Sequence, residues 1–344
     1  MSSELTLSVV DQSPVRKGGT ATQALRETVQ LAQAVERMGY SRYWVAEHHN
    51  SGSFAGTSPE ILIGQIAAAT NSIRVGSGGV MLSHYSSLKV AEQFRMLEAL
   101  FPGRIDLGIG RAPGSDQLTA SALAHPREQI DIRYFPQQVA DLLGFVHGLA
   151  DPGHPFAQIA IQPGPQPESV PEVWLLGSSD YSAQLAGMLG LPFAFAAFFG
   201  RNAAIGPPVA DLYRSKFQPT VFGQEPRLSV SVAVMCAPTE DEAIFLSSTR
   251  RFSRAARVIG LRGGLLPPEE ATAYPLPEEA QRSMDEPNQG SVDGTPEQVR
   301  DGILKIAAQY DTHDMGIVTN CYSFEHRVRS YQLVADVFDL SPPA

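Results

Sequence analysis

The chain has 344 residues, of which 36 are acidic and 26 basic, so its formal net charge is −10. At about 150 residues per domain, this length allows one large domain or two modest ones. The 43% of apolar residues can form a sizeable core, and the acidic balance argues against a nucleic-acid or anionic-membrane partner, since both select basic surfaces.

The cysteine content and the length of the apolar segments argue against a disulfide-rich, secreted or membrane-spanning protein. Two cysteines, Cys236 and Cys321, cannot form a disulfide framework and lack the spacing of a metal site. The N-terminus has no basic region followed by an apolar stretch, so no signal peptide is expected. The longest apolar run, 191–199, is shorter than the roughly 20 residues of a membrane span. We therefore expect a soluble, cytoplasmic protein.

Short apolar segments that are predicted to be strands recur along the chain. They lie at 5–10, 42–47, 73–78, 104–110, 172–177, 192–197, 229–236 and 315–320. Most are continuous apolar runs rather than alternating ones, which is typical of parallel strands covered on both faces.

Helix signals lie between these strands. Thr20, Thr239 and Thr295 are each followed three residues later by Gln or Glu, which is the pattern of a capping box. Pro59 stands at a first helical position after Ser58, where proline is favoured. Each segment between two strands is therefore predicted to contain a helix.

This repeat predicts an α/β fold, a (β/α)₈ TIM barrel in one domain over 1–344, rather than an open doubly wound sheet. Two intervals between strands are too long for a simple unit. We interpret them as insertions of about 112–170 after strand four and 257–294 after strand seven. Both would lie at the C-terminal face, where barrel loops build active sites.

Polar clusters follow five of the predicted strands, and we expect them to meet at one mouth of the barrel. They are Asp11–Gln12, Glu47–His49, Gly76–Gly79, Gly110–Arg111 and Gly177–Ser179.

His48 and His49 follow Glu47 at the end of predicted strand two. Adjacent strand residues point to opposite faces, so at most one imidazole faces the barrel axis. That imidazole could move a proton near pH 7 or stabilise an anion, or it could simply bond to a neighbouring loop. A metal site is not expected, because it needs three or four convergent ligands and no other predicted strand end has a histidine.

Arg111 follows predicted strand four. The preceding Gly108-x-Gly110 is similar to a dinucleotide fingerprint, but the third glycine position is Pro113. A planar guanidinium at the barrel mouth is instead suited to holding a phosphate. The alternative is an ion pair between Arg111 and a loop carboxylate.

Ser178 and Ser179 connect predicted strand five to a helix that begins near Tyr181. Hydroxyl groups and unpaired backbone N–H groups at a helix N-terminus favour an anion. One phosphate could therefore contact both these serines and Arg111. The alternative is a serine that only caps the helix.

Five segments in this order resemble the bacterial-luciferase-like family of flavin-dependent oxidoreductases, and the likeness covers nearly the full chain. They are VAEHHN (45–50), IRVGSGGVML (73–82), SSLKVAEQFRMLEALFPGRIDLGIGRAPG (86–114), VWLLGSSDYSAQLAGMLGLPFAFA (173–196) and GTPEQV (294–299).

This resemblance implies that reduced FMN binds at the C-terminal ends of the barrel strands. His48 matches the family's catalytic histidine, and Arg111 matches the arginine that holds the flavin phosphate. Ser178 matches a serine beside that phosphate, where we also expect Ser179 and Tyr181. Tyr181 stands where luciferase itself has a threonine.

The resemblance also implies that Gly78 and Gly79 form a peptide, often cis, against which the isoalloxazine ring packs. Because a side chain would hinder that approach, Gly79→Val is expected to weaken flavin binding far more than it lowers the stability of the ligand-free protein. An apolar pocket would be lined by Phe54, His84, Tyr85, Phe198 and Phe199.

The expected activity is that of an FMN-dependent monooxygenase. It would use dioxygen and reduced FMN, supplied by a separate NAD(P)H–flavin reductase, to oxidise a small organic substrate. The alternatives are a deazaflavin-dependent dehydrogenase on the same barrel, a non-catalytic flavin-binding protein and a metal-dependent hydrolase. Family members are often dimers, so a homodimer is expected.

Overall fold

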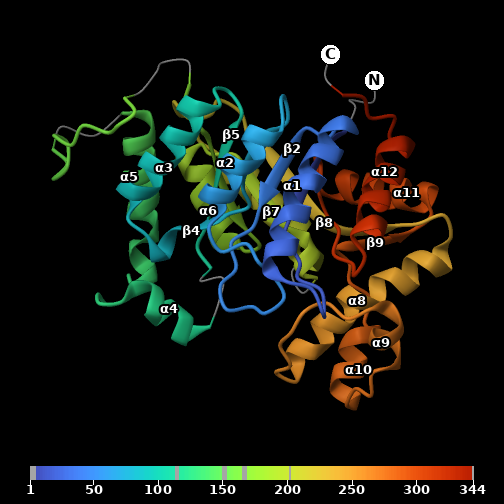
Figure 1. Ribbon diagram of the computed structural model, residues 1–344. Helices are drawn as coiled ribbons and strands as arrows, with labels where there is room; N and C mark the ends of the chain where they lie inside the picture. The colour runs from blue at the N-terminus through green and yellow to red at the C-terminus, as the bar shows by residue number, and fades with distance from the viewer. Residues whose placement is uncertain (1–4, 113–115, 149–152, 165–168, 201–202, 343–344) are drawn as a thin grey trace.

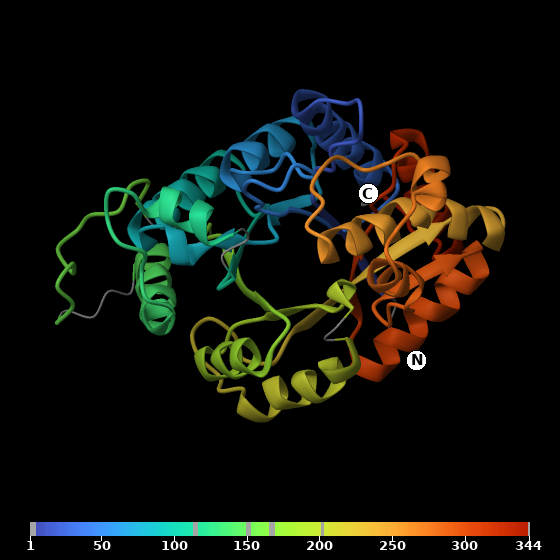
Figure 2. The same cartoon turned by 90° about the horizontal axis from the view of Figure 1, so that it is seen from below.

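The computed structural model describes residues 5–112, 116–148, 153–164, 169–200 and 203–342. Its centre is a closed barrel of eight parallel strands (Figures 1 and 2). In barrel order they are β1 (Thr6–Asp11), β2 (Arg42–Val45), β3 (Arg74–Ser77), β5 (Ile105–Gly110), β6 (Glu172–Gly177), β7 (Phe193–Ala196), β8 (Leu228–Cys236) and β10 (Asp314–Val318).

The barrel closes through β10, which pairs with β1 on one side and with β8 on the other. In this register Val9 lies opposite Ile317, and Ile317 lies opposite Val232. The barrel prediction is therefore confirmed, and all of its strands were expected. Two short strands were not: β4 (Val80–Met81) pairs with β5, and β9 (Ser291–Gly294) extends the sheet beside β8.

Helices surround the strands, as the view from below shows (Figure 2). The outer ring comprises α1 (Ala21–Arg37), α2 (Pro59–Ala69), α3 (Ser87–Leu100), α5 (Phe135–His147), α6 (Asp180–Leu189), α7 (Gly206–Lys216), α8 (Glu240–Val258), α11 (Pro296–Tyr310) and α12 (Phe324–Val337). Within the described part of the chain, no helix is long and apolar enough to cross a membrane.

The predicted helix caps are present. The hydroxyls of Thr20 and Thr239 accept hydrogen bonds from the backbone N–H three residues later, at 3.1 and 3.3 Å. At Thr295 both bonds of the capping box with Gln298 form. These bonds satisfy backbone donors that the first turn of a helix otherwise leaves unpaired.

Additional elements follow β5 and β8, where the two insertions were predicted. The first segment adds α4 (Gln117–Ala124) and the short helix η2 (Ile132–Tyr134), and parts of it lie outside the described residues. The second adds α9 (Pro268–Ala273) and α10 (Glu278–Asp285), which pack on α8 through an apolar cluster of their own. Helices α4, α9 and α10 lie toward the lower end of the barrel in Figure 1, which is the C-terminal end of the strands.

Apolar side chains fill the barrel interior. Trp44 and Trp174 meet edge to face, with ring centroids 5.3 Å apart, and belong to a buried cluster with Val10, Ala194 and Val318. Such large rings leave little room along the barrel axis, so the interior is a packed core rather than a channel.

Ion pairs close the barrel on the other side of these rings, at the N-terminal ends of the strands. The buried Asp106 carboxylate accepts hydrogen bonds from Trp44 Nε1 at 2.8 Å and Arg74 Nε at 3.0 Å. Arg42 lies 4.9 Å above the Trp174 ring and donates to Asp314 at 2.6 Å. Each of these charges has a partner of opposite charge or a hydrogen bond, and these contacts offset the free-energy cost of burying it.

Candidate active site

The carboxyl ends of the strands bring the predicted polar clusters to the mouth of the barrel. Asp11, the last residue of β1, is fully buried and accepts bonds from Ser13 N at 2.7 Å, Arg327 Nη2 at 2.6 Å and the Tyr43 hydroxyl. Burial would raise the pKa of Asp11, but Arg327 and the hydrogen bonds outweigh it and lower the pKa. These three donors occupy the Asp11 carboxylate, so we assign Asp11 a structural role at the mouth rather than a role in binding reactants.

Glu47 is also fully buried, and its carboxylate connects three neighbouring segments. Oε1 accepts from the Tyr85 hydroxyl at 2.7 Å and from His49 Nε2 at 2.8 Å, and Oε2 accepts from the backbone N–H of Met81 at 2.9 Å. Glu47 was expected at the strand end, but its sequence context predicted no role for it. These contacts make it the organising residue of this side of the mouth.

His48 has a different environment from His49. Its ring packs on Phe54 with centroids 4.8 Å apart, and its Nδ1 is buried with no hydrogen-bond partner among the described residues. Burial, reinforced by the positive charge of Arg257, lowers the pKa of His48 to about 4. The ring is therefore neutral at pH 7. Since β2 ends at Val45, both histidines lie in the following loop rather than on the strand as predicted.

Gly78 and Gly79 are joined by a cis peptide bond, as the resemblance implied. Gly78 N–H donates to the carbonyl of Val45 at 2.8 Å, which places this peptide beside the end of β2. A Cβ atom on Gly79 would stand only 2.7 Å from the carbonyl oxygen of Gly108. Gly79→Val therefore collides with the backbone of β5 and is expected to lower the stability of the ligand-free protein, whereas its larger effect on flavin binding stays a prediction.

Arg111, just beyond β5, lies over the ring of Tyr181 in the first turn of α6, with 4.1 Å between the guanidinium carbon and the ring centroid. Its guanidinium donates no hydrogen bond to any residue that the structure describes, and neither does it pair with a described carboxylate. Ser179 is the N-cap of α6, yet its side chain makes no capping bond. Ser178 lies between it and the end of β6.

These groups fit a flavin phosphate. Five guanidinium N–H donors, the Ser179 hydroxyl and the N-terminus of α6 lie at neighbouring strand ends, and each favours an anion. The buried, unpartnered Nδ1 of His48 is a polar atom that a bound ligand could satisfy. Within the residues described, no group of three or more His, Cys, Asp or Glu side chains could hold a metal ion.

The aromatic residues predicted to line a pocket fall into two groups. Phe54 contacts His48, and His84, in the short helix η1 (Leu82–His84), lies 6.5 Å from His49 between ring centroids. Phe198 and Phe199 lie across the barrel in η3 (Ala197–Phe199), their rings 4.4 Å apart. Phe199 is 54% exposed.

Polar residues after β10 also reach the mouth, although they were not among the predicted site residues. Asn320 Nδ2 donates to Gln12 Oε1 at 2.5 Å, while Asn320 Oδ1 and Thr319 Oγ1 are buried without partners among the described residues. Thr319 and Asn320 form a polar pair directly after β10. Polar residues directly after a strand were the pattern that predicted the other clusters at the mouth.

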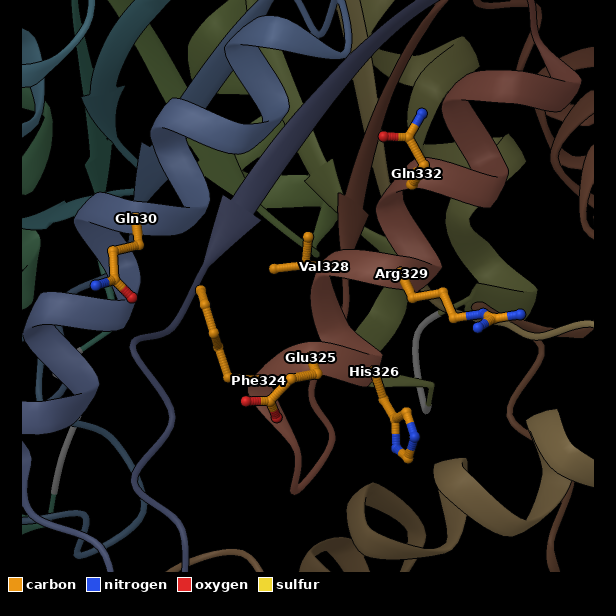
Figure 3. A pocket seen from close by; sticks show the side chains of 7 residues that line it. All are labelled: Gln30, Phe324, Glu325, His326, Val328, Arg329 and Gln332. Carbon is orange, nitrogen blue, oxygen red and sulfur yellow. The ribbon is translucent and has the colours of Figure 1, made fainter.

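Two surface hollows lie away from the barrel axis. A cleft of about 390 Å³ reaches Tyr85 and His84 from the side of α2 and α3. A broad, open groove of about 910 Å³ lies between α1 and α12, where Gln30 faces Phe324 and Val328 (Figure 3). This groove lies on the outer helical layer, so we do not assign it to the candidate site.

Comparisons with known proteins identify the family of the chain. The sequence pattern of the family described as "Luciferase-like monooxygenase" matches residues 5–313. The chain is 38% identical to N-acetyl-S-alkylcysteine monooxygenase of Bacillus subtilis (strain 168), covering 96% of this chain and 97% of that protein. It is also 38% identical to a luciferase-like monooxygenase of Escherichia coli (strain K12), covering 97% of both.

Solved structures give the same result. Apo-MsnO8 superposes with a TM-score of 0.89 at 40% identity, over 99% of this chain and 100% of that one. The oxygenating constituent of 3,6-diketocamphane monooxygenase from Pseudomonas putida, solved with FMN, has a TM-score of 0.72 at 19% identity, over 99% of this chain and 98% of that one, and shows the likeness of fold alone. The chain therefore belongs to the luciferase-like monooxygenase family.

Proposed function

We propose that this protein is an FMN-dependent monooxygenase that oxidises a small organic substrate. The observation that carries the proposal is Arg111, whose guanidinium lies over the Tyr181 ring while its donors lack acceptors among the described residues. A cation arranged in this way at the N-terminus of a helix is prepared for a phosphate monoester such as that of FMN.

The bound cofactor would supply two electrons, so that one atom of dioxygen enters the substrate and the other leaves as water. The chain's own residues would bind and orient the reactants. Arg111, Ser178, Ser179 and Tyr181 would hold the phosphate, and the peptide between Gly78 and Gly79 would lie against the ring system.

His48 is the proposed catalytic histidine of this site. Its ring is neutral at pH 7, so it would act as a hydrogen-bonding group toward the bound reactants rather than as a cation. Phe54 packs against this ring and would limit access of water to it.

A binding and turnover experiment tests the proposal. The purified protein should bind reduced FMN under anaerobic conditions more tightly than reduced riboflavin or a reduced deazaflavin cofactor. Admitting dioxygen should then yield oxidised substrate together with one water per turnover. A preference for the deazaflavin, or the absence of any flavin binding, would contradict the proposal. The 38% identical relative makes N-acetyl-S-alkylcysteines the first substrates to test.

We further propose that the protein is a cytoplasmic homodimer that receives reduced FMN from a separate NAD(P)H–flavin reductase. Large apolar side chains lie exposed on the adjacent helices α2 and α3: Ile61 is 72% exposed, Met96 55% and Leu100 65%. A second copy of the chain would remove this apolar surface from water.

Replacing Ile61 with Asp tests the dimer. The variant is expected to be monomeric by light scattering at concentrations where the wild type is dimeric, because a charge would be buried in the interface. The exposed Leu304→Asp on α11, on another face of the barrel, is the matched control. A wild-type protein that is monomeric at all concentrations would refute this proposal.

A further inference from the structure

His49, which follows His48 in the chain, has the geometry of a proton acceptor. His49 Nε2 lies 2.8 Å from Glu47 Oε1, and the Glu47 side chain is 1% exposed. An ionised carboxylate only accepts hydrogen bonds, so Nε2 carries the ring proton in this contact. The neutral ring then has its lone pair on Nδ1.

Nδ1 of His49 is available for a ligand. Among the residues that the structure describes it has no hydrogen-bond partner, and 12% of the side chain is exposed. A buried carboxylate bonded to one imidazole nitrogen, with the other nitrogen open, is the arrangement that serves as a general base in hydrolytic triads.

The carboxylate itself is fixed from two further directions. The Tyr85 hydroxyl donates to Oε1 at 2.7 Å, and Met81 N–H donates to Oε2 at 2.9 Å. Burial and the adjacent Glu47 charge raise the pKa of Tyr85 above its usual value, so this hydroxyl stays protonated and keeps donating. Glu47 therefore cannot rotate away from His49 without breaking two other bonds.

The two adjacent histidines therefore differ in their hydrogen-bond partners and can serve different chemical roles. Among the described residues, His48 has no acidic partner within hydrogen-bond distance, and its buried Nδ1 is unpaired. His49 has a buried carboxylate behind it, which would stabilise the positive charge that appears when the ring takes up a proton. Two other titratable rings lie near His49: the Tyr85 hydroxyl is 3.3 Å from its Nε2, and the His84 ring is 6.5 Å away and nearly perpendicular.

We propose that His49, oriented by Glu47, takes up a proton at Nδ1 from the reactants bound at the barrel mouth, and that Glu47 and Tyr85 are its positioning residues. The proposal rests on the monooxygenase function proposed above. The proton leaves an O–H, N–H or S–H group of a bound reactant, the electron pair stays on that atom, and the ring becomes imidazolium. The proton is later released to the water that forms with the second oxygen atom.

The first test needs no ligand. Nitrogen-15 NMR of the imidazole groups in the ligand-free protein at pH 8 should show the neutral ring of His49 with its proton on Nε2. In Glu47→Gln this tautomer should lose its dominance, because a carboxamide cannot accept from Tyr85, His49 and Met81 N–H at once. A wild-type ring protonated on Nδ1 would overturn the proposal.

The second test uses turnover with reduced FMN and N-acetyl-S-methylcysteine. His49→Ala should lose about 10²- to 10⁴-fold in rate, the usual range for a general base, with FMN affinity within about threefold of the wild type. Added imidazole should restore part of this rate in His49→Ala but not in His48→Ala. Tyr85→Phe, which keeps the ring and the contact between Glu47 and His49, should lose less than Glu47→Gln.

The control is His326→Ala, an exposed histidine in the groove on α12, which should leave the rate unchanged. If the wild type neither binds FMN nor consumes oxygen, the proposed function fails, whereas the tautomer still decides whether Glu47 orients His49. If the wild type turns over and His49→Ala does so equally fast, the role of His49 is refuted.

Discussion

Removal of the Arg111 guanidinium separates phosphate binding from ring binding. In Arg111→Ala the cation over Tyr181 is lost, but no described ion pair or hydrogen bond of the guanidinium is broken. A charge-assisted hydrogen bond contributes about 1.5–3 kcal/mol, which corresponds to a loss of about 10- to 100-fold in affinity for FMN. Riboflavin has no phosphate, so its affinity should be nearly unchanged.

The ligand-free protein should tolerate this substitution, because a cation–π contact at a partly exposed site contributes only about 0.5–1 kcal/mol. Flavin fluorescence titration gives both dissociation constants, and thermal unfolding gives the stability. Arg133→Ala is the matched control, since Arg133 is exposed and pairs with Asp131 in its own turn. Equal weakening of FMN and riboflavin would show that Arg111 does not hold the phosphate.

Three further substitutions have defined outcomes. His48→Ala should retain FMN affinity while turnover, followed by oxygen consumption, falls about 10²- to 10⁴-fold; unchanged turnover would exclude His48 from the chemistry. Arg327→Met leaves the buried Asp11 carboxylate unpaired and should cost about 3–5 kcal/mol in urea unfolding. Because folding lowers the pKa of Asp11, its contribution to stability is present above a pH of about 4 and is lost as pH falls through the folded value. Gly79→Val should lower the melting temperature of the ligand-free protein, since its Cβ meets the Gly108 carbonyl; an unchanged melting temperature would contradict that collision.

The barrel could be predicted because parallel strands buried on both faces produce continuous apolar runs such as VWLLG (173–177) and FAFAA (193–197). The two missed strands lack that signal. β4 has only two residues, and β9 (SVDG) is a half-buried strand that lies outside the closed barrel.

The two sides of the candidate site differed in how far they could be predicted. Arg111 and Ser179 follow neighbouring strands, so the order of the barrel was enough to bring them together. The partners of Glu47 could not be found in this way. Met81 and Tyr85 come 34 and 38 residues later and reach it through β4, the strand that sequence patterns did not reveal.

The packed indoles and the ion pairs of Asp106 fill the barrel axis behind the mouth. If the substrate covers the cofactor at the C-terminal ends of the strands, the cofactor cannot leave through the axis, because Trp44, Trp174 and Asp106 fill it. The reactant that lies deeper then binds first and leaves last. Such an arrangement predicts an ordered kinetic mechanism, in which an excess of the outer reactant slows release of the inner one.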